Sequence, residues 1–180
     1  MNDLHQNDIT DLFVHIPEKR WGFLQTRAKH EKQAMRTLAS QGVIVYLPLI
    51  TKVEIHNRGK RERYLPMFQG YVFTCSSMAE DIIIRRNKYV WNLKTLSAAE
   101  EESLLKDLKI VREYELLSAQ HKLVVKPQLQ EGDKVFLKNG PFKKHEVIVV
   151  KRKDESNIIV NLEFLGRSIE ITCNAEDLVY

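Results

Sequence analysis

The chain is poor in glycine and cysteine, and it lacks the short motifs of common enzyme and metal sites. Its 180 residues include 7 glycines and 2 cysteines. Glycines this scarce do not supply a phosphate-binding loop, and the sequence contains no GxSxG, P-loop or HExxH motif. Cys75 and Cys173 have no CxxC or Cys/His spacing around them, which argues against a disulfide framework and a zinc site. We therefore expect two buried cysteines in strands, and a protein without catalytic, cofactor-binding or metal-binding residues.

Long apolar runs are also missing. The longest are pieces such as Val147 to Val150, far short of the roughly 20 residues that span a bilayer. The polar N-terminus lacks the basic-then-apolar pattern of a signal peptide, while the 43% hydrophobic content is that of a folded globular protein. We expect a soluble, cytoplasmic monomer with no membrane partner.

Positive charge is concentrated in one stretch, although the formal net charge is only +4. Residues 19–96 contain 15 Lys and Arg against 5 Asp and Glu, a surplus of +10, whereas residues 1–18 carry −4. A contiguous basic surplus is typical of a module that works beside a nucleic acid. The alternative is a solvated face that only aids solubility.

The pattern of residues 19–117 predicts an α+β domain with a mostly antiparallel sheet. Ser77 with Glu80, and Ser97 with Glu100, form capping boxes that open two helices, and a third helix is expected at 29–41. Turn-forming residues at 57–60 sit between two extended arms and predict a hairpin with a basic tip. Strands are expected at 21–26, 43–47, 52–56, 63–65, 68–74 and 90–93.

The rest of the chain divides into an extension, a linker and a small β domain. Residues 1–18 are acidic and without clear periodicity, so they are expected to form a loosely attached extension. Residues 118–127 end at a proline and are interpreted as a linker, which leaves 128–180 as the second domain. Its Val- and Ile-rich segments favour strand over helix and fit a barrel of four or five strands. These segments are 134–137, 146–151, 158–164 and 168–172.

Several pieces of sequence carry a family resemblance through their order and spacing. They are the Trp21 strand followed by His30-Glu31-Lys32, the run from Leu65 to Phe73, the Glu131-Gly132-Asp133 segment leading to Gly140-Pro141-Phe142, and Phe164 to Arg167. Together they resemble the NusG family of transcription elongation factors, in which an NGN domain precedes an SH3-like KOW domain. The resemblance implies a factor that binds the clamp of RNA polymerase.

Within that family, the chain looks closer to RfaH and the UpxY-type regulators of polysaccharide operons. Pro48-Leu49-Ile50-Thr51, the hairpin tip at 58–61 and Pro66-Met67-Phe68 carry this likeness. It implies recruitment to particular operons and suppression of pausing and premature termination. The alternative is a non-enzymatic RNA-binding or ribosome-associated KOW protein, although the NGN-like half has no reason to accompany a ribosomal KOW domain.

The resemblance also implies three groups of binding residues. Those matching the polymerase-binding face of the NGN domain are Leu65, Pro66, Phe68 and Tyr71. The basic candidates for contacts with non-template DNA or nascent RNA are Arg27, Lys29, Arg58, Lys60, Arg61 and Lys88. In the KOW domain, the residues placed where relatives bind a ribosomal protein or Rho are Phe142, Leu165, Arg167 and Ile169.

Strand alternation sets one condition on the polymerase-binding group. In a strand that includes 68–74, Phe68 and Tyr71 point to opposite faces. The two aromatics can share one surface only if the strand begins after Phe68.

Overall fold

A four-stranded antiparallel sheet forms the centre of the N-terminal half. The computed structural model describes residues 13–56, 59–118, 123–127, 134–136, 146–152, 155–162, 164–165 and 167–173. The strand order is β2-β5-β1-β6, which confirms the predicted α+β domain with an antiparallel sheet. These strands are β1 (Arg20–Thr26), β2 (Ile44–Tyr46), β5 (Tyr71–Ser76) and β6 (Val90–Thr95).

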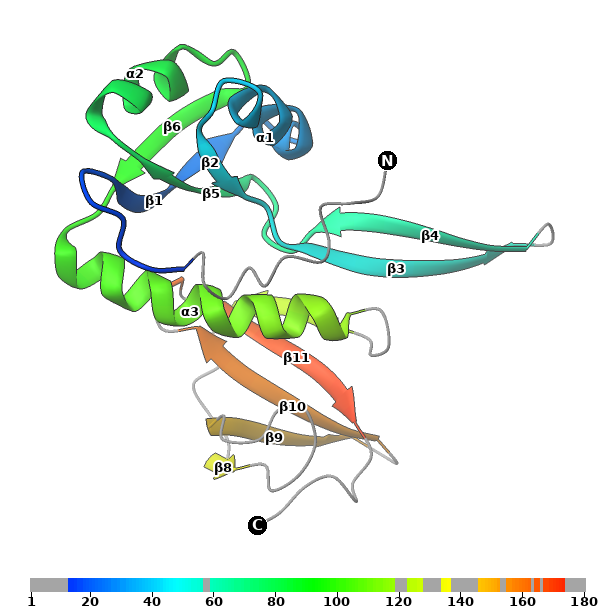
Figure 1. The fold of residues 1–180 in the computed structure, drawn as a ribbon. Coiled ribbons are helices and arrows are strands. Elements are labelled where there is room, and N and C mark those ends of the chain that lie inside the picture. The colour runs from blue at the N-terminus through cyan, green and yellow to red at the C-terminus, as the bar shows by residue number, and fades with distance from the viewer. Residues whose placement is uncertain are drawn as a thin grey trace.

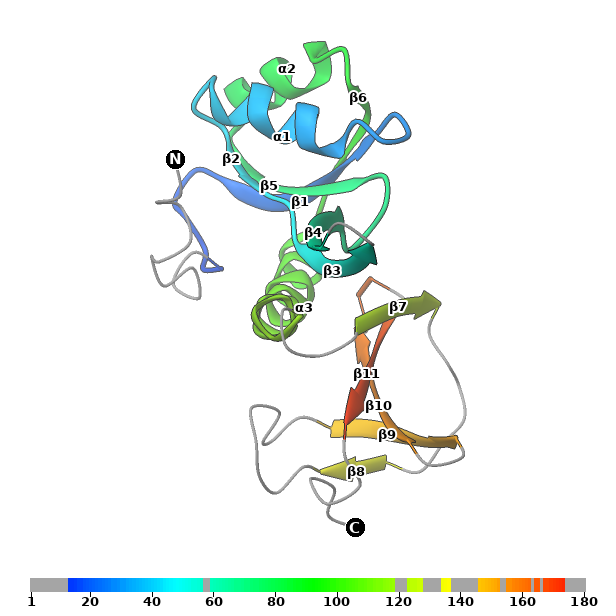
Figure 2. The ribbon, with the colours of Figure 1, turned by 90° about the vertical axis from the view of Figure 1, so that its right-hand side faces the viewer.

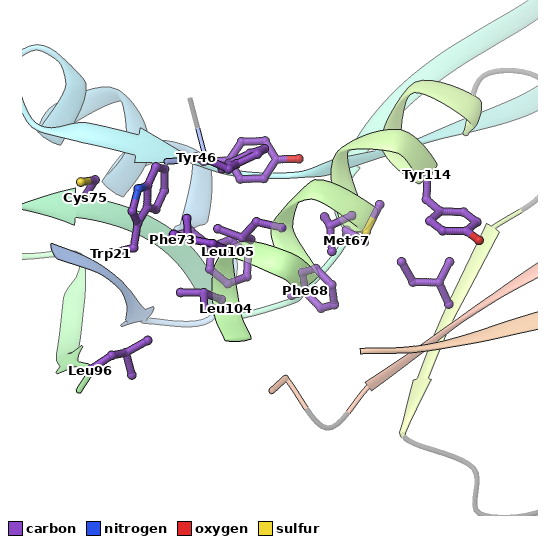
Figure 3. Packing of buried hydrophobic residues seen from close by; sticks show 14 residues of the cluster. Trp21, Tyr46, Met67, Phe68, Phe73, Cys75, Leu96, Leu104, Leu105 and Tyr114 are labelled. Atoms are coloured by element: carbon purple, nitrogen blue, oxygen red, sulfur yellow. The ribbon is translucent and has the colours of Figure 1, made fainter. Parts of the chain in front are cut away.

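Three helices cover the two faces of this sheet. Helices α1 (Glu31–Ala39) and α2 (Met78–Arg86) lie on one face, and α3 (Ala98–Leu117) lies across the other (Figure 1). On the α1 and α2 side, Leu24 and Val72 of the sheet are fully buried. On the α3 side, the buried Phe68 and Phe73 lie close to Leu104 and Leu105 of the helix (Figure 3). Because successive side chains of a strand point to opposite faces, the neighbours Val72 and Phe73 of β5 supply two separate cores.

The helix boundaries follow the predicted capping signals. Ser77 and Ser97 each accept a hydrogen bond from the backbone N–H three residues later, and Glu80 and Glu100 reciprocate, so both capping boxes are confirmed. Helix α1 ends before Gly42, whose φ of 82° belongs to the left-handed region that glycine adopts without a steric penalty.

The chain entering β1 is packed more firmly than the expected loose extension. Phe13 is 1% exposed and contacts the rings of Trp21 and Tyr46 at centroid distances of 5.5 and 5.0 Å. The Trp21 indole also donates to the carbonyl of Val14. Tertiary contact with a single phenylalanine thus fixes a segment whose own sequence has no regular pattern; residues 1–12 lie outside the described residues.

The predicted hairpin is longer than its sequence signal. Strands β3 (Leu49–His56) and β4 (Gly59–Pro66) pair along their whole length, from Leu49 with Pro66 to His56 with Gly59, and project away from the sheet (Figure 1). The Glu115 carboxylate of α3 fixes the base of this hairpin, because it accepts the N–H of Leu49 and the hydroxyl of Tyr46 at 2.8 and 2.9 Å. Burial and the Glu115 charge raise the pKa of Tyr46, so that its hydroxyl keeps its proton.

A second antiparallel sheet follows α3, on the side of that helix away from the first sheet (Figure 2). Its five strands have the order β7-β11-β10-β9-β8. Strand β7 occupies part of the segment interpreted as a linker. It pairs with β11, which lies far away in the sequence, so the local pattern gave no signal for it. The strands are β7 (Leu123–Pro127), β8 (Lys134–Phe136), β9 (Glu146–Arg152), β10 (Glu155–Leu162) and β11 (Arg167–Cys173).

Candidate functional site

Four aromatic side chains lie together on the α3 side of the first sheet. Phe23 of β1 and Phe73 of β5 are direct cross-strand partners, and Tyr71 lies two residues before Phe73 on the same face of β5. The rings of Phe23 and Tyr71 are 5.6 Å apart, and those of Phe68 and Phe73 are 5.9 Å apart. We call Phe23, Phe68, Tyr71 and Phe73 the aromatic face.

Phe68 joins this face because it precedes the strand. Strand β5 begins at Tyr71, and residues 67–70 form a turn in which the Tyr71 N–H donates to the Phe68 carbonyl at 3.2 Å. Gly70 allows the turn through a φ of 81°. The condition set by strand alternation is therefore met, and Phe68 and Tyr71 line one hollow.

A segment from the second sheet is docked on the aromatic face. Backbone N–H groups of Phe164 and Leu165 donate to one carboxylate oxygen of Asp107 on α3, at 3.0 and 3.2 Å. The Phe164 ring meets Phe23 edge to face, with centroids 6.5 Å apart. Ile169, which follows on β11, is fully buried in the same core cluster.

The docked segment leaves a small hollow of about 160 Å³ over the aromatic face. Two cationic side chains, Lys94 of β6 and Arg167 of β11, line it together with the aromatic face, Phe164 and Leu165. Leu65 and Pro66, also predicted in the polymerase-binding group, are not among the residues that line this hollow. They end β4 at the base of the hairpin, where Leu65 is 39% exposed.

The structure divides the predicted nucleic-acid contacts into two groups. Arg27, Lys29 and Lys88 gather at one end of the first sheet, where the Arg27 N–H donates to the carbonyl of Tyr89. The Lys88 ammonium lies 5.1 Å from the Tyr89 ring centroid, and that ring stacks on His30. The second group belongs to the hairpin: Lys60 and Arg61 lie on β4, and Arg58 is outside the described residues.

Three of the four predicted partner-binding residues of the second domain belong to the docked contact. Leu165 and Arg167 line the hollow, and Ile169 is buried behind it. Phe142 lies outside the residues that the structure describes. The contact therefore brings the polymerase-binding and the KOW-partner candidates together, although they are almost 100 residues apart in the sequence.

Sequence reasoning missed three residues that matter here. Phe23 carried a usable signal, since it shares a face with Trp21 two residues earlier in the predicted strand. Asp107 carried another, because it is an acid that lies within the apolar stripe of α3 and is 5% exposed. Nothing in the local pattern singled out Trp91, which is 77% exposed on β6.

Within the described ranges, no cluster of three or more His, Cys, Asp or Glu residues is placed to hold a metal ion. In the same part of the chain, no helix combines the length and apolarity that a membrane span requires. Cys75 is buried in β5 as predicted, and burial raises the pKa of its thiol to about 11.

Comparison with known proteins identifies the first domain. The family model described as transcription termination factor nusG matches residues 19–111, more than half of the chain. The chain belongs to the NusG family. Its four-stranded sheet with three helices is the NGN-like part of that family, as the resemblance implied, and this places the chain among transcription elongation factors.

Three solved structures match the chain at low sequence identity. The structure described as "Domain interaction in Thermotoga maritima NusG" is 20% identical to this NusG-family chain, covers 88% of it and 95% of its own chain, and has a TM-score of 0.49. Conformation A of the MjSpt4:Spt5 complex is 17% identical, with 86% and 99% coverage and a TM-score of 0.28. Conformation B is 18% identical, with 88% and 95% coverage and a TM-score of 0.27. No curated protein sequence matches the chain.

Proposed function

We propose that this protein binds the clamp of RNA polymerase through the aromatic face and acts as an antitermination factor at particular operons, in the manner of RfaH and the UpxY-type regulators. The observation that carries the proposal is the aromatic face itself. One or two aromatic side chains in a pocket supply most of the energy of a small protein interface. The action needs no catalysis or cofactor, and we expect it in a cytoplasmic monomer.

The docked segment supports this role for the aromatic face. The Phe164 ring packs on Phe23, and Leu165 lines one hollow with Phe68 and Tyr71, so the face accepts apolar groups from outside its own domain. Apolar side chains that a domain leaves exposed mark interaction sites, and departure of the segment would expose more of the partly buried Phe23 and Tyr71. A polymerase surface with apolar side chains at the same spacing would replace the segment.

The polymerase can replace the docked segment only after that segment has left the aromatic face. We propose a closed state, which is the one observed, and an open state in which both domains are free for partners. Leu165, Arg167 and Ile169, with Phe142, would then bind a ribosomal protein or Rho from a KOW barrel. Since only the open state offers the whole aromatic face, the apparent dissociation constant for polymerase rises as the open fraction falls.

The basic group at the end of the sheet suits the nucleic acid of an elongation complex. We propose that Arg27, Lys29 and Lys88 contact phosphates of the exposed non-template strand or of nascent RNA. The hairpin residues Arg58, Lys60 and Arg61 form a second contact. Contacts of this kind depend on salt, because each neutralised phosphate releases counterions.

The proposal is tested by measuring polymerase affinity for the full chain and two tyrosine variants. Tyr71→Ala removes a half-buried ring from the aromatic face, and a loss of about 2 kcal/mol at an interface hot spot corresponds to ~30-fold weaker binding. Tyr64→Ala is the matched control, since Tyr64 is 48% exposed on the hairpin. Equal affinity of Tyr71→Ala and wild type would refute the site, and ribosome binding without polymerase binding would favour the RNA-binding alternative.

A further inference from the structure

The aromatic face has an end that the docked segment does not cover. A second, shallow hollow of about 470 Å³ opens there, and Tyr71 lines both hollows. Neither Phe164 nor Leu165 is among the described residues that line the second one. Its largest side chain, Trp91, is 77% exposed. The lining residues are Gln25, Thr26, Arg27, Gly70, Tyr71 and Trp91.

A β-bulge places Trp91 on this side of the sheet. Asn92 of β6 pairs with Gln25 of β1, and Val90 pairs with Thr26. Trp91 therefore has no partner on β1 and is the bulged residue of β6. Val90 packs into the core on the α1 and α2 side, whereas Trp91 lines the open hollow. Bulges redirect side chains in this way and are frequent beside functional sites.

The wall behind Trp91 is ordered by side-chain amides. Asn92 donates to the Gln25 side-chain carbonyl at 3.4 Å, and the Gln25 amide donates to the Tyr71 hydroxyl at 3.5 Å. This chain of contacts runs from β6 across β1 to β5. It joins the open hollow to the aromatic face as one continuous surface.

We infer that Trp91 is the first contact of RNA polymerase with the closed molecule. This rests on the proposed function of the aromatic face. Tryptophan, tyrosine and arginine are the residues most enriched among interface hot spots, and all three line the open hollow. The partner surface that fits presents an apolar side chain to the Trp91 indole and the Tyr71 ring, while Arg27 keeps its proposed contact with nucleic acid.

The position of Trp91 gives it a kinetic role. In the closed state the Phe23 part of the face is occupied by Phe164, so a partner that needs the whole face must wait for spontaneous opening. A partner that lands on Trp91 and Tyr71 is held beside the docked segment while the segment leaves. Trp91 therefore accelerates association in the closed molecule and matters less for association once the face is open.

The experiment measures association and dissociation rates of the full chain with RNA polymerase. The variants are wild type, Trp91→Ala, Asp107→Ala, which loses the acceptor of the docked segment, and the double variant. Trp91→Ala is expected to slow association about 10-fold in the wild-type background and less than about 3-fold in the Asp107→Ala background. Leu116→Ala, which removes an apolar side chain that is 59% exposed on α3, is the control and should change neither rate.

The outcomes separate this inference from the proposed function. If Trp91→Ala associates and dissociates like wild type while Tyr71→Ala binds weakly, the inference fails and the proposed function stands. Loss of binding to a single-stranded DNA oligonucleotide, with polymerase rates unchanged, would overturn it in favour of a base-stacking site. If neither variant changes polymerase binding, both ideas fail together.

Discussion

Asp107 holds the docked segment on the aromatic face, and removal of the Asp107 carboxylate should expose that face. One carboxylate oxygen accepts the backbone N–H groups of Phe164 and Leu165. In Asp107→Ala both donors lack this acceptor while the segment is docked, and they regain hydrogen bonds with water when it leaves. The substitution therefore destabilises the closed state relative to the open one.

The size of the effect follows from the geometry. A hydrogen bond to a charged group contributes about 1.5–3 kcal/mol net, and Asp107 is 5% exposed, so solvent weakens these bonds little. Because the two bonds share one oxygen, we expect about 2–4 kcal/mol for the pair rather than twice the single value. That corresponds to a ~30- to 1000-fold shift toward the open state.

Amide hydrogen exchange at Phe164 and Leu165 reports the opening, and polymerase affinity reports its consequence. Amide exchange at these two residues should accelerate ~30- to 1000-fold. The affinity for polymerase should rise until the open state dominates. Asp107→Asn keeps an uncharged acceptor and should lie between wild type and Asp107→Ala. Glu102→Ala, which removes an exposed acid of the same helix, is the charge-matched control. Unchanged exchange at both amides in Asp107→Ala would show that the Asp107 hydrogen bonds do not hold the docked segment.

Three further substitutions test the packing around β1, each by chemical denaturation. Gly22→Ala should lower the free energy of unfolding by about 1–3 kcal/mol, because its Cβ would lie 2.5 Å from the Lys94 carbonyl oxygen; wild-type stability would contradict that close approach. Glu101→Ala should cost about 1–3 kcal/mol, since the buried carboxylate accepts the Trp21 N–H, and Glu101→Gln should cost less. Ser77→Ala should lower the free energy of unfolding by about 1 kcal/mol, because the cap of α2 is lost. A variant as stable as wild type would show that water replaces the Ser77 hydroxyl.

Most of the first domain could be predicted from sequence because its signals are local. The capping boxes at Ser77 and Ser97 specify helix starts within a few residues, and Gly42 ends α1 through its left-handed conformation. The four residues matched to the polymerase-binding group divide in the structure. Phe68 and Tyr71 line one hollow, whereas Leu65 and Pro66 lie at the hairpin base.

The parts that sequence reasoning missed depend on distant contacts. Ring contacts with Trp21 and Tyr46 hold Phe13 in place. Strand β7 forms because it pairs with β11. Contacts of this kind leave no periodic trace in the segment itself, because propensity is a weak prior that tertiary packing overrides. The docking of Phe164 on α3 belongs to the same class, since its hydrogen bonds come from backbone N–H groups, which every residue other than proline carries.

The most direct test of the central claim is single-round transcription by the cognate RNA polymerase, with and without this protein, on its own operon leader and on an unrelated template. We predict increased read-through of pause and terminator sites on the operon leader alone, and loss of that increase in Tyr71→Ala. Read-through that is unchanged on both templates, from a polymerase preparation that binds the protein, would contradict the proposed antitermination function.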